Sequence, residues 1–321
     1  MVQEMRKAAT REAVGPTLSR LAQNGLDIVV VDADLGVSTS AAKFGKAFPD
    51  RFVTVGVAEQ SMIGVAAGLA AAGKIAFAST FAVFAPGRCF DQIRMVVAQP
   101  GLNVKIVGSH AGVITGEDGA SAQALDDLAL MLSMPPVRVL VPADVVEAEQ
   151  AVEAAARAYG PFYIRVGRPK IPVIHDGEFR FRVGRSEMLR PGRDVTIMAV
   201  GVMEPPALSG AKLLSLEGID CRVLNMSSLR PIDREAVLAA AGETGAVVTA
   251  EDHFVHGGLG GLVAELLSCE LPTPMTMVGM ERYGTSGRWD ELLEHFHLTP
   301  ARLASEAKAV LARKSGQRDC C

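Results

Sequence analysis

Near-continuous apolar runs alternate along the first half of the chain with longer segments in which apolar residues recur every three or four positions. An unbroken apolar run is typical of a strand buried on both faces of a parallel sheet, whereas the longer period is typical of an amphipathic helix. The pattern predicts strands at 26–34, 52–56, 75–80, 103–109, 137–142 and 161–167, and helices at 7–23, 60–72, 88–98, 122–133 and 144–158. This alternation predicts an open α/β sheet with helices on both faces.

The alternation stops at residues 170–193, a segment with several Pro and Gly residues, strand-like alternation and no helical period. A second α/β unit follows it. The predicted strands of this unit lie at 194–201, 220–226, 245–252 and 275–280, and its helices at 206–217, 233–241, 258–268, 287–295 and 300–313. We therefore expect two doubly wound α/β domains, with the first at 1–170, a linker at 171–192, the second at 193–314 and a tail at 315–321.

Composition fits this layered architecture and argues against several classes of function. The 321 residues suffice for two cores, and 49% hydrophobic with 21% charged residues is a globular balance. A net charge of −4 without a long basic run gives no reason to expect nucleic acid as a partner. The N-terminal segment lacks the apolar core of a signal peptide, and no apolar run has the length of a membrane span. We expect a cytoplasmic protein without a membrane partner.

The five cysteines have no spacing typical of a disulfide framework or a zinc site, so we expect no metal ligands from this chain. Cys320 and Cys321 do not fit the prenylation pattern, because Arg318 stands where the modified cysteine would be. We interpret the two terminal cysteines as part of a frayed tail.

Polar and aromatic side chains follow the predicted strands of the first domain. Ligands of open α/β sheets bind beyond the carboxyl ends of the strands, so these side chains are the candidates for function. They are Asp32, Asp34, Ser38, Glu59, Phe81, Phe84, His110, Glu117, Asp118, Arg165 and Arg168, with Arg11 on the first helix. One mouth would gather several acids, one imidazole, several guanidinium groups and two phenyl rings.

Each of these residues also has a purely structural interpretation. Glu59 stands in an apolar stretch, where a buried carboxylate is costly unless it is paired, but an acid at a helix start also favours the helix dipole. Phe81 and Phe84 are three residues apart, which is ordinary for core residues. His110 could be a loop histidine, and 116–119 could be only a turn. Their common position at strand ends is the stronger indication.

Several motifs resemble one family. The stretches VTVGVAEQSMIGVAAGLAAAG, FASTFAVFAPGRCFDQIR and GSHAGVITGEDGASAQALDD strongly resemble the pyrimidine-binding domain of the transketolase family. The stretches TAEDHFVHGGLGG and YGTSGRWDELLEHFHLTPARL resemble its C-terminal domain. The resemblance covers about residues 5–312 in the family's order, and it implies a thiamine-diphosphate enzyme.

One motif of this family is missing. Thiamine-diphosphate enzymes hold the diphosphate and a divalent metal such as Mg²⁺ with a Gly-Asp-Gly segment and a later Asn, and this chain contains no Gly-Asp-Gly. The resemblance therefore implies the second half of a transketolase that is split into two polypeptides. The N-terminal subunit would bring the diphosphate and metal site, and two copies of each chain would form an α2β2 assembly.

The resemblance implies a role for residues on the cofactor side. Glu59 matches the glutamate that hydrogen-bonds the pyrimidine ring of thiamine diphosphate and favours its imino tautomer. Phe84 matches the aromatic ring that stacks on the aminopyrimidine, with Phe81 beside it. Asp34 matches an acid near the cofactor and the facing subunit.

The resemblance also implies a substrate site. Arg11, Ser38, His110 and Arg168 match residues that hold the phosphate of a sugar phosphate, and Asp118 matches an acid that binds substrate hydroxyl groups. Two guanidinium groups, a hydroxyl and an imidazole suit a phosphate chemically. One position departs from the family, because Ala122 stands where a histidine usually contacts donor hydroxyls. We hypothesise an altered ketose donor or a bulkier or less polar acceptor.

The sequence leaves other functions open. The β subunit of a 2-oxo-acid dehydrogenase has a similar length and layout, but the expected phosphate clamp argues against it. Deoxyxylulose phosphate synthase shares the AEQ-type motif but is normally a single chain. A non-catalytic scaffold subunit is the third alternative, and the presence of Glu59 and Phe84 argues against it. The leading interpretation is transfer of a two-carbon ketol unit from a ketose phosphate to an aldehyde.

Overall fold

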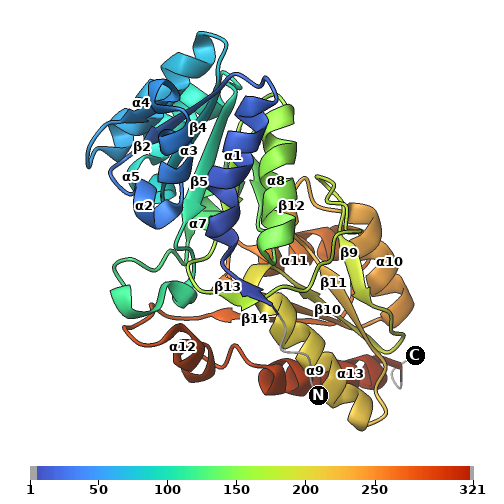
Figure 1. Cartoon of the computed structure of the whole chain (residues 1–321). Coiled ribbons are helices and arrows are strands. Elements are labelled where there is room, and N and C mark those ends of the chain that lie inside the picture. Colours follow the sequence, from blue (N-terminus) through green and yellow to red (C-terminus); the bar gives the residue numbers. More distant parts are fainter. Residues whose placement is uncertain (1–5, 319–321) are drawn as a thin grey trace.

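The computed structural model describes residues 6–318 and consists of two α/β domains (Figure 1). In Figure 1 the first domain, coloured blue to green, lies above the second, coloured yellow to red. Each domain has a central sheet covered by helices on both faces, as the sequence predicts. No helix within these residues is long and apolar enough to cross a membrane.

The first sheet has seven strands in the order β12-β6-β7-β5-β4-β2-β3. All neighbours are parallel except β12, which pairs antiparallel with β6. The strands are β2 (Ile28–Asp32), β3 (Phe52–Thr54), β4 (Ile75–Phe81), β5 (Val104–Ser109), β6 (Arg138–Leu140), β7 (Phe162–Arg165) and β12 (Ser228–Arg230). Their parallel direction brings the carboxyl ends of β2, β4 and β5 to one edge of the sheet, where the candidate residues follow.

Helices of the first domain cover both faces of this sheet, and apolar side chains fill the space between them. Val31 and Ile106 of the sheet pack with Met62 and Ile63 of α4 in one core cluster. The helices are α1 (Val14–Gln23), α2 (Gly36–Thr39), α3 (Ala42–Ala47), α4 (Glu59–Ala71), α5 (Ala85–Arg88), α6 (Phe90–Gln92), α7 (Asp127–Leu132) and α8 (Val145–Arg157). Short 3₁₀ turns at 10–13, 49–51 and 113–118 and a π-helical turn at 93–98 complete the domain.

The second domain has five strands in the order β14-β13-β10-β11-β9. The strands are β9 (Glu187–Arg190), β10 (Val195–Ala199), β11 (Cys221–Asn225), β13 (Val247–Phe254) and β14 (Met275–Met280). The helices are α9 (Glu204–Leu216), α10 (Arg234–Thr244), α11 (Leu259–Glu270), α12 (Trp289–His295) and α13 (Pro300–Arg318), with a 3₁₀ turn at 201–203. A second core cluster includes Ile197, Val223 and Val248, and the first cluster continues across the junction to Met198 and Leu259, so the apolar packing joins the two domains.

Short strands extend each sheet from outside its predicted domain, and the hydrophobic pattern does not reveal them. β12 lies in the second half of the chain but extends the first sheet, and β9 lies within the predicted linker but joins the second sheet as its antiparallel edge. The small pair β1 (Lys7–Ala8) and β8 (Ile171–Pro172) ties the chain start to the same linker. These strands have two to four residues, which is too short for a recognisable period.

Several predicted helix boundaries are wrong. The helix expected at 7–23 begins only at Val14, after β1 and a 3₁₀ turn. The helix expected at 122–133 is confined to α7, and the one at 88–98 is divided into short helices and a π-helical turn. α13 continues to Arg318, so residues 315–318 are helical and not a tail. Cys320 and Cys321 lie outside the described residues.

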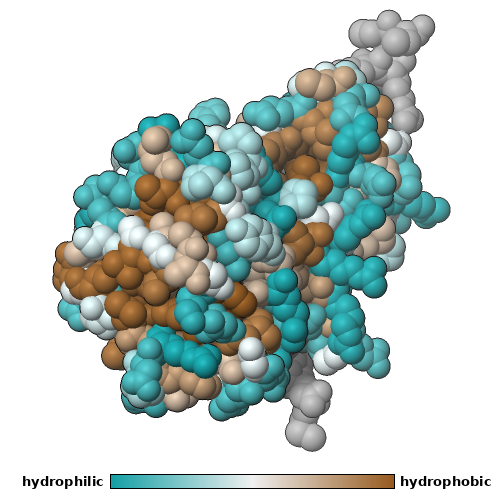
Figure 2. Space-filling view, turned by 90° about the horizontal axis from the view of Figure 1, so that it is seen from above, coloured by the Kyte–Doolittle hydropathy of each residue, from teal (hydrophilic) through white to brown (hydrophobic). Residues whose placement is uncertain are grey.

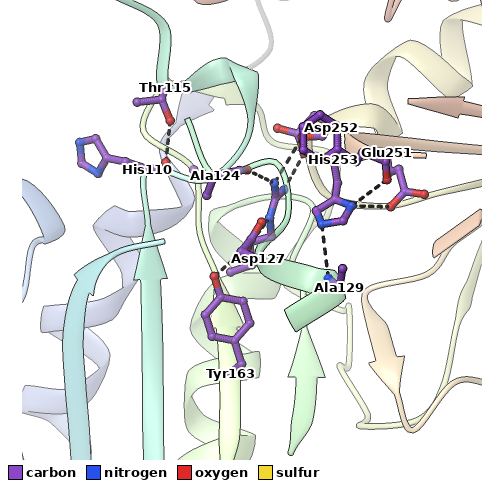
Figure 3. A network of polar contacts seen from close by, with 12 residues as sticks. His110, Thr115, Ala124, Asp127, Ala129, Tyr163, Glu251, Asp252 and His253 are labelled. Atoms are coloured by element: carbon purple, nitrogen blue, oxygen red, sulfur yellow. Dashed lines mark hydrogen bonds and ion pairs between the residues drawn. The ribbon is translucent and has the colours of Figure 1, made fainter. Parts of the chain in front are cut away.

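A buried polar network fixes the two domains at their junction (Figure 3). Arg165, at the end of β7, donates to Asp127 (Nε to Oδ2, 2.9 Å) and to Asp252 of the second domain (Nη1 to Oδ1, 2.6 Å). The Tyr163 hydroxyl donates to the same Asp127 oxygen at 2.7 Å. Gly112 has φ +77° and approaches so closely that an added Cβ would lie 1.7 Å from the Asp252 carboxylate. The junction is therefore closely packed, and Arg165, expected at the mouth, belongs to it.

Candidate functional site

The candidate residues meet where β2, β4 and β5 end, and the backbone there is strained. Asp34, Ser40 and His110 have φ values of +64°, +71° and +57°, a region that side chains with a Cβ adopt rarely. Among the described residues only His297 shares this conformation without being glycine. Strained backbone clusters at functional sites because the surrounding fold must hold it, and here it turns the chain sharply after two strands.

Glu59 is the first residue of α4, directly after the loop that follows β3. Its side chain is 3% exposed, and its Oε2 accepts a hydrogen bond from Nη1 of Arg88 at 2.7 Å. The helix N-terminus adds a favourable dipole, as the structural interpretation of Glu59 requires. The dipole does not explain why the carboxylate is buried beside aromatic rings. The ion pair with Arg88 reduces the cost of that burial.

Two phenyl rings and an imidazole form a stack, and Arg88 joins this stack to the Glu59 carboxylate. The rings of Phe81 and Phe84 are nearly parallel, with centroids 5.8 Å apart, and the His110 ring lies 3.9 Å from Phe81. Phe81 and Phe84 are only half-buried, unlike the fully buried Phe44 and Phe77 of the core. Partly exposed parallel rings beside a buried acid can receive a flat heteroaromatic group.

His110 is held as a neutral imidazole. Its ring is buried, and this burial, assisted by the positive charges of Arg11 and Arg168, lowers the pKa of His110 to about 3. Nδ1 lies 3.0 Å from the Ser109 hydroxyl, so that contact fixes one ring nitrogen. A neutral ring between two guanidinium groups can donate a hydrogen bond to an anion without adding a further full charge.

The two arginines approach His110 from opposite parts of the first domain. Arg11, in the first 3₁₀ turn, donates to the backbone carbonyl groups of Ser38 and Arg168. Arg168, after β7, donates to the Thr115 carbonyl oxygen at 2.7 Å and to Glu117 Oε2 at 2.8 Å. The structure thus brings Arg11 and Arg168 close to His110, and it places the backbone carbonyl of Ser38 against Arg11.

Asp118 lies in the turn that faces Arg168. Its Oδ1 is 3.5 Å from Arg168 Nη1, and both side chains are more than a third exposed. The turn interpretation of 116–119 is also correct, since Gly119 has φ +82°. The Ser286 hydroxyl of the second domain donates to the Glu117 carbonyl oxygen at 2.6 Å, so this turn is supported from both domains.

Ala122 follows this turn and is half-buried. The helix expected to begin at Ala122 begins only at Asp127, as α7. Before α7, the side chain of Gln123 connects the two domains. The Gln123 amide donates to Thr285 O at 2.9 Å and to Val113 O at 3.3 Å. The chain around Ala122 is therefore fixed, while its own methyl group offers no polar contact.

The remaining acids after β2 line a cleft of about 220 Å³ together with Ser38. Asp34 is exposed there. Asp32 is buried, and burial raises the pKa of its carboxyl group, opposed by a hydrogen bond from the Gly36 backbone. Asp34 therefore reaches the surface at the mouth.

Arg88 is the residue of this site that sequence reasoning missed. Its guanidinium carbon lies over the Phe84 ring at 4.6 Å from the centroid, while Nη1 binds Glu59. Its spacing of four residues from Phe84 resembles one helical turn, but the contact with Glu59 spans 29 residues and has no local signal. Within residues 6–318 no group of three or more His, Cys, Asp and Glu side chains is arranged to hold a metal ion.

Comparison with known proteins supports one family for both domains. Residues 6–173 match the family described as transketolase, pyrimidine binding domain, and residues 184–303 match transketolase, C-terminal domain. A transketolase C-terminal section from Methanocaldococcus jannaschii is 42% identical over 92% of this chain and 93% of its own length. The 6-deoxy-6-sulfo-D-fructose transketolase subunit SqwH of Clostridium sp. strain MSTE9 is 41% identical over 95% of both.

A solved structure agrees with this assignment. The structure of a split gene transketolase, described as an inactive beta4 tetramer, is 48% identical and has a TM-score of 0.89 over 96% of this chain and all of the other. By contrast, the chain spans about half the length of the mammalian transketolases that it matches.

Proposed function

The chain belongs to the transketolase family, as the C-terminal subunit of a split transketolase, and we propose that it supplies the pyrimidine-binding half of a thiamine-diphosphate site. The observation that carries the proposal is the position of Glu59, which is buried at the start of α4 and joined through Arg88 to the partly buried Phe84 ring. A carboxyl group and an aromatic face are what an aminopyrimidine needs for one hydrogen bond and one stacking contact. These residues therefore fit the pyrimidine half of the cofactor.

We assign roles to the groups on this side of the site. Glu59 would accept or share the proton of a ring nitrogen, Phe84 would stack on the ring with Phe81 behind it, and Asp34 would face the partner subunit. The bound cofactor would supply the carbanion chemistry that carries a two-carbon unit between sugars. The protein's contribution is to orient the ring and to keep water from it.

The anion clamp supports a sugar phosphate as the substrate class. Arg11, His110 and Arg168 would hold the phosphate of a ketose phosphate, with Ser38 at its edge and Asp118 on a hydroxyl group. Arg168 has exchangeable carboxylate partners at the surface, so an incoming phosphate can replace Glu117 and Asp118 as its anion. This clamp has no purpose in decarboxylation of a small 2-oxo acid, which argues against the 2-oxo-acid dehydrogenase alternative.

A partner subunit would complete the site. The chain has no Gly-Asp-Gly segment, so the diphosphate and its Mg²⁺ or similar divalent ion would be held mainly by an N-terminal subunit with that motif and a later Asn. Figure 2 shows patches of apolar residues on the left and in the upper right part of the face, and the exposed large apolar residues of the first domain include Val37, Val57, Met95 and Val96. Such a surface suits subunit contacts in an α2β2 assembly.

The catalytic proposal and the scaffold alternative predict different results for the reconstituted complex. If the proposal is correct, the purified chain should lack activity alone and gain thiamine-diphosphate-dependent ketol transfer when mixed with the N-terminal subunit. If the mixture forms a stable complex but transfers no ketol group with any of a panel of ketose phosphates, the catalytic proposal is wrong. A 6-sulfo ketose belongs in the panel, because SqwH is described as acting on such a sugar and a sulfonate resembles a phosphate in shape.

The donor preference can be tested at Ala122. Ala122→His would restore a hydrogen-bonding group where this chain has a methyl group, so it should change kcat/KM between donors by about tenfold, the effect of one hydrogen bond of about 1 kcal/mol or more. If the ratios of kcat/KM between donors are the same for wild type and variant across the panel, Ala122 does not determine the donor preference.

A further inference from the structure

Arg88 occupies both contacts that the proposed cofactor site would offer. Its Nη1 binds Glu59 Oε2 at 2.7 Å, and its planar guanidinium group lies over the Phe84 ring with 4.6 Å between the central carbon and the centroid. A flat cation on an aromatic face is a favourable contact. The guanidinium group thus takes the hydrogen-bond acceptor and the stacking surface at the same time.

We propose that Arg88 covers the pyrimidine site of the free chain and leaves the Phe84 ring when an aminopyrimidine binds. This inference rests on the proposed function. An aminopyrimidine cannot stack on the face of Phe84 that Arg88 covers while the guanidinium group is there, because both groups need van der Waals contact with the same phenyl carbons. Cofactor binding is therefore coupled to a change of the Arg88 side chain.

The surroundings of Arg88 allow this movement of the side chain. Its side chain is 48% exposed, whereas Glu59 is 3% exposed, so the arginine can turn toward water while the acid cannot. Its backbone is held, because the Gln60 amide donates to the Arg88 carbonyl oxygen at 3.0 Å. The preceding Gly87 has nothing within 4 Å of an added Cβ, which leaves open space on this side. A fixed backbone with a free side chain suits a group that changes partners.

The same contact has a benefit for the free chain. A buried carboxylate without a partner is strongly destabilising, and Arg88 supplies that partner until the site is completed. It also shields the half-exposed Phe84 ring from water. Thiamine diphosphate can bind only to the fraction of molecules in which Arg88 has left the ring. The apparent affinity for thiamine diphosphate is therefore lowered in proportion to that fraction.

The experiment measures thiamine diphosphate binding to the complex of this chain with its N-terminal subunit. Arg88→Met keeps a flexible apolar side chain but removes the planar cation, and Arg157→Met is the matched control, since Arg157 is an exposed arginine of α8 that pairs with Glu153 at 2.9 Å. We expect Arg88→Met to bind the cofactor about tenfold faster or tighter than wild type, and Arg157→Met to bind as wild type. Unchanged or weaker binding by Arg88→Met would overturn the inference.

A second measurement does not depend on the stability of an Arg88 variant. In wild-type chain, the Arg88 Nε–Hε proton should show an upfield ring-current shift in NMR spectra, and Phe84→Leu should remove this shift. A normal Arg88 chemical shift in wild type would also overturn the inference. If wild-type complex binds no thiamine diphosphate, the proposed function fails. If Glu59→Gln abolishes turnover but Arg88→Met binds the cofactor as wild type, only the Arg88 inference fails.

Discussion

The mouth of the first domain and the junction between the domains are built from the same kind of pair, an arginine beside carboxylates, but they differ in enclosure. At the junction, the Arg165 side chain is 4% exposed and pairs with Asp127 and Asp252, which are 1% exposed (Figure 3). At the mouth, the side chains of Arg88 and Arg168 are 48% and 34% exposed. Enclosed pairs cannot exchange partners, whereas open pairs can.

This difference separates structural from functional charges. Arg165 also donates to the carbonyl oxygens of Ala124 and Asp252, so almost every part of its guanidinium group is bonded. Arg168 binds the Glu117 carboxylate, whose side chain is 59% exposed, so water competes with this pair. Three predictions test whether enclosure decides the role of each group, and they are ordered by the expected size of the effect.

The largest effect is expected at the centre of the junction. Arg165→Met leaves Asp127 and Asp252 buried without a cation and should lower the free energy of unfolding by about 3–5 kcal/mol. Urea unfolding followed by circular dichroism measures this change, with Arg157→Met as the control that should stay within about 0.5 kcal/mol. A loss at Arg165 no larger than in the control would mean that the junction network does not hold the domains.

A pH-dependent effect of intermediate size is expected at Glu251, which lies at the same junction. Its carboxylate accepts from the backbone N–H groups of Leu259 and Gly260 at 2.9 and 2.8 Å, but burial outweighs these bonds and raises the pKa of Glu251 to about 7. Between the unfolded value of about 4.3 and pH 7, the folded chain keeps a proton that the unfolded chain has lost. Stability from this group is therefore lost as pH rises.

Glu251→Gln should remove this pH dependence, because the amide does not titrate. The free energy of unfolding of wild type relative to Glu251→Gln should fall by on the order of 2 kcal/mol between pH 5 and pH 8. Parallel curves for the two proteins over this range would contradict the assignment. At the mouth, His110 gives a pH dependence of the opposite sign. Because its pKa is lowered in the folded chain, His110 contributes to the free energy of unfolding at neutral pH, and this contribution is lost as the pH falls below about 6.5.

The third prediction concerns the open arginine of the clamp. Arg168→Met should raise KM for a ketose phosphate by about 10- to 100-fold, the effect of one charge-assisted hydrogen bond, with little change in unfolding free energy. Arg168→Lys should recover part of this loss, because lysine retains the charge but not the planar fork. If Arg168→Met instead destabilised the fold as strongly as Arg165→Met, enclosure would not distinguish the two regions.

The sequence predicts the parts of this comparison that depend on local pattern. The buried strands and the position of Glu59 at a helix start follow from periodicity, and the common location of His110 and Arg168 follows from the rule of strand ends. The junction does not follow, because Arg165 and Asp252 are 87 residues apart and pair only after both sheets form. For the same reason the sequence places Arg165 at the mouth together with Arg168, which follows it by three residues, whereas the structure places Arg165 at the junction.

The boundaries of helices and strands follow from the sequence best where the periodic segment is long. α4 and α8, with 13 residues each, lie where the apolar pattern places helices. β12 has three residues and joins the sheet of the other domain, so neither its period nor its place in the chain indicates its partner. Ion pairs such as Arg88 with Glu59 also depend on side-chain directions that only the folded chain defines.

Turnover of Glu59→Gln tests the central claim most directly. Glutamine has nearly the same size and can form a hydrogen bond, but it cannot share a proton with a cofactor ring as a carboxyl group does. In complex with the N-terminal subunit and saturating thiamine diphosphate, the variant should lose about 100-fold or more in kcat for ketol transfer while the complex still assembles. Wild-type kcat in an assembled, cofactor-loaded Glu59→Gln complex would contradict the account.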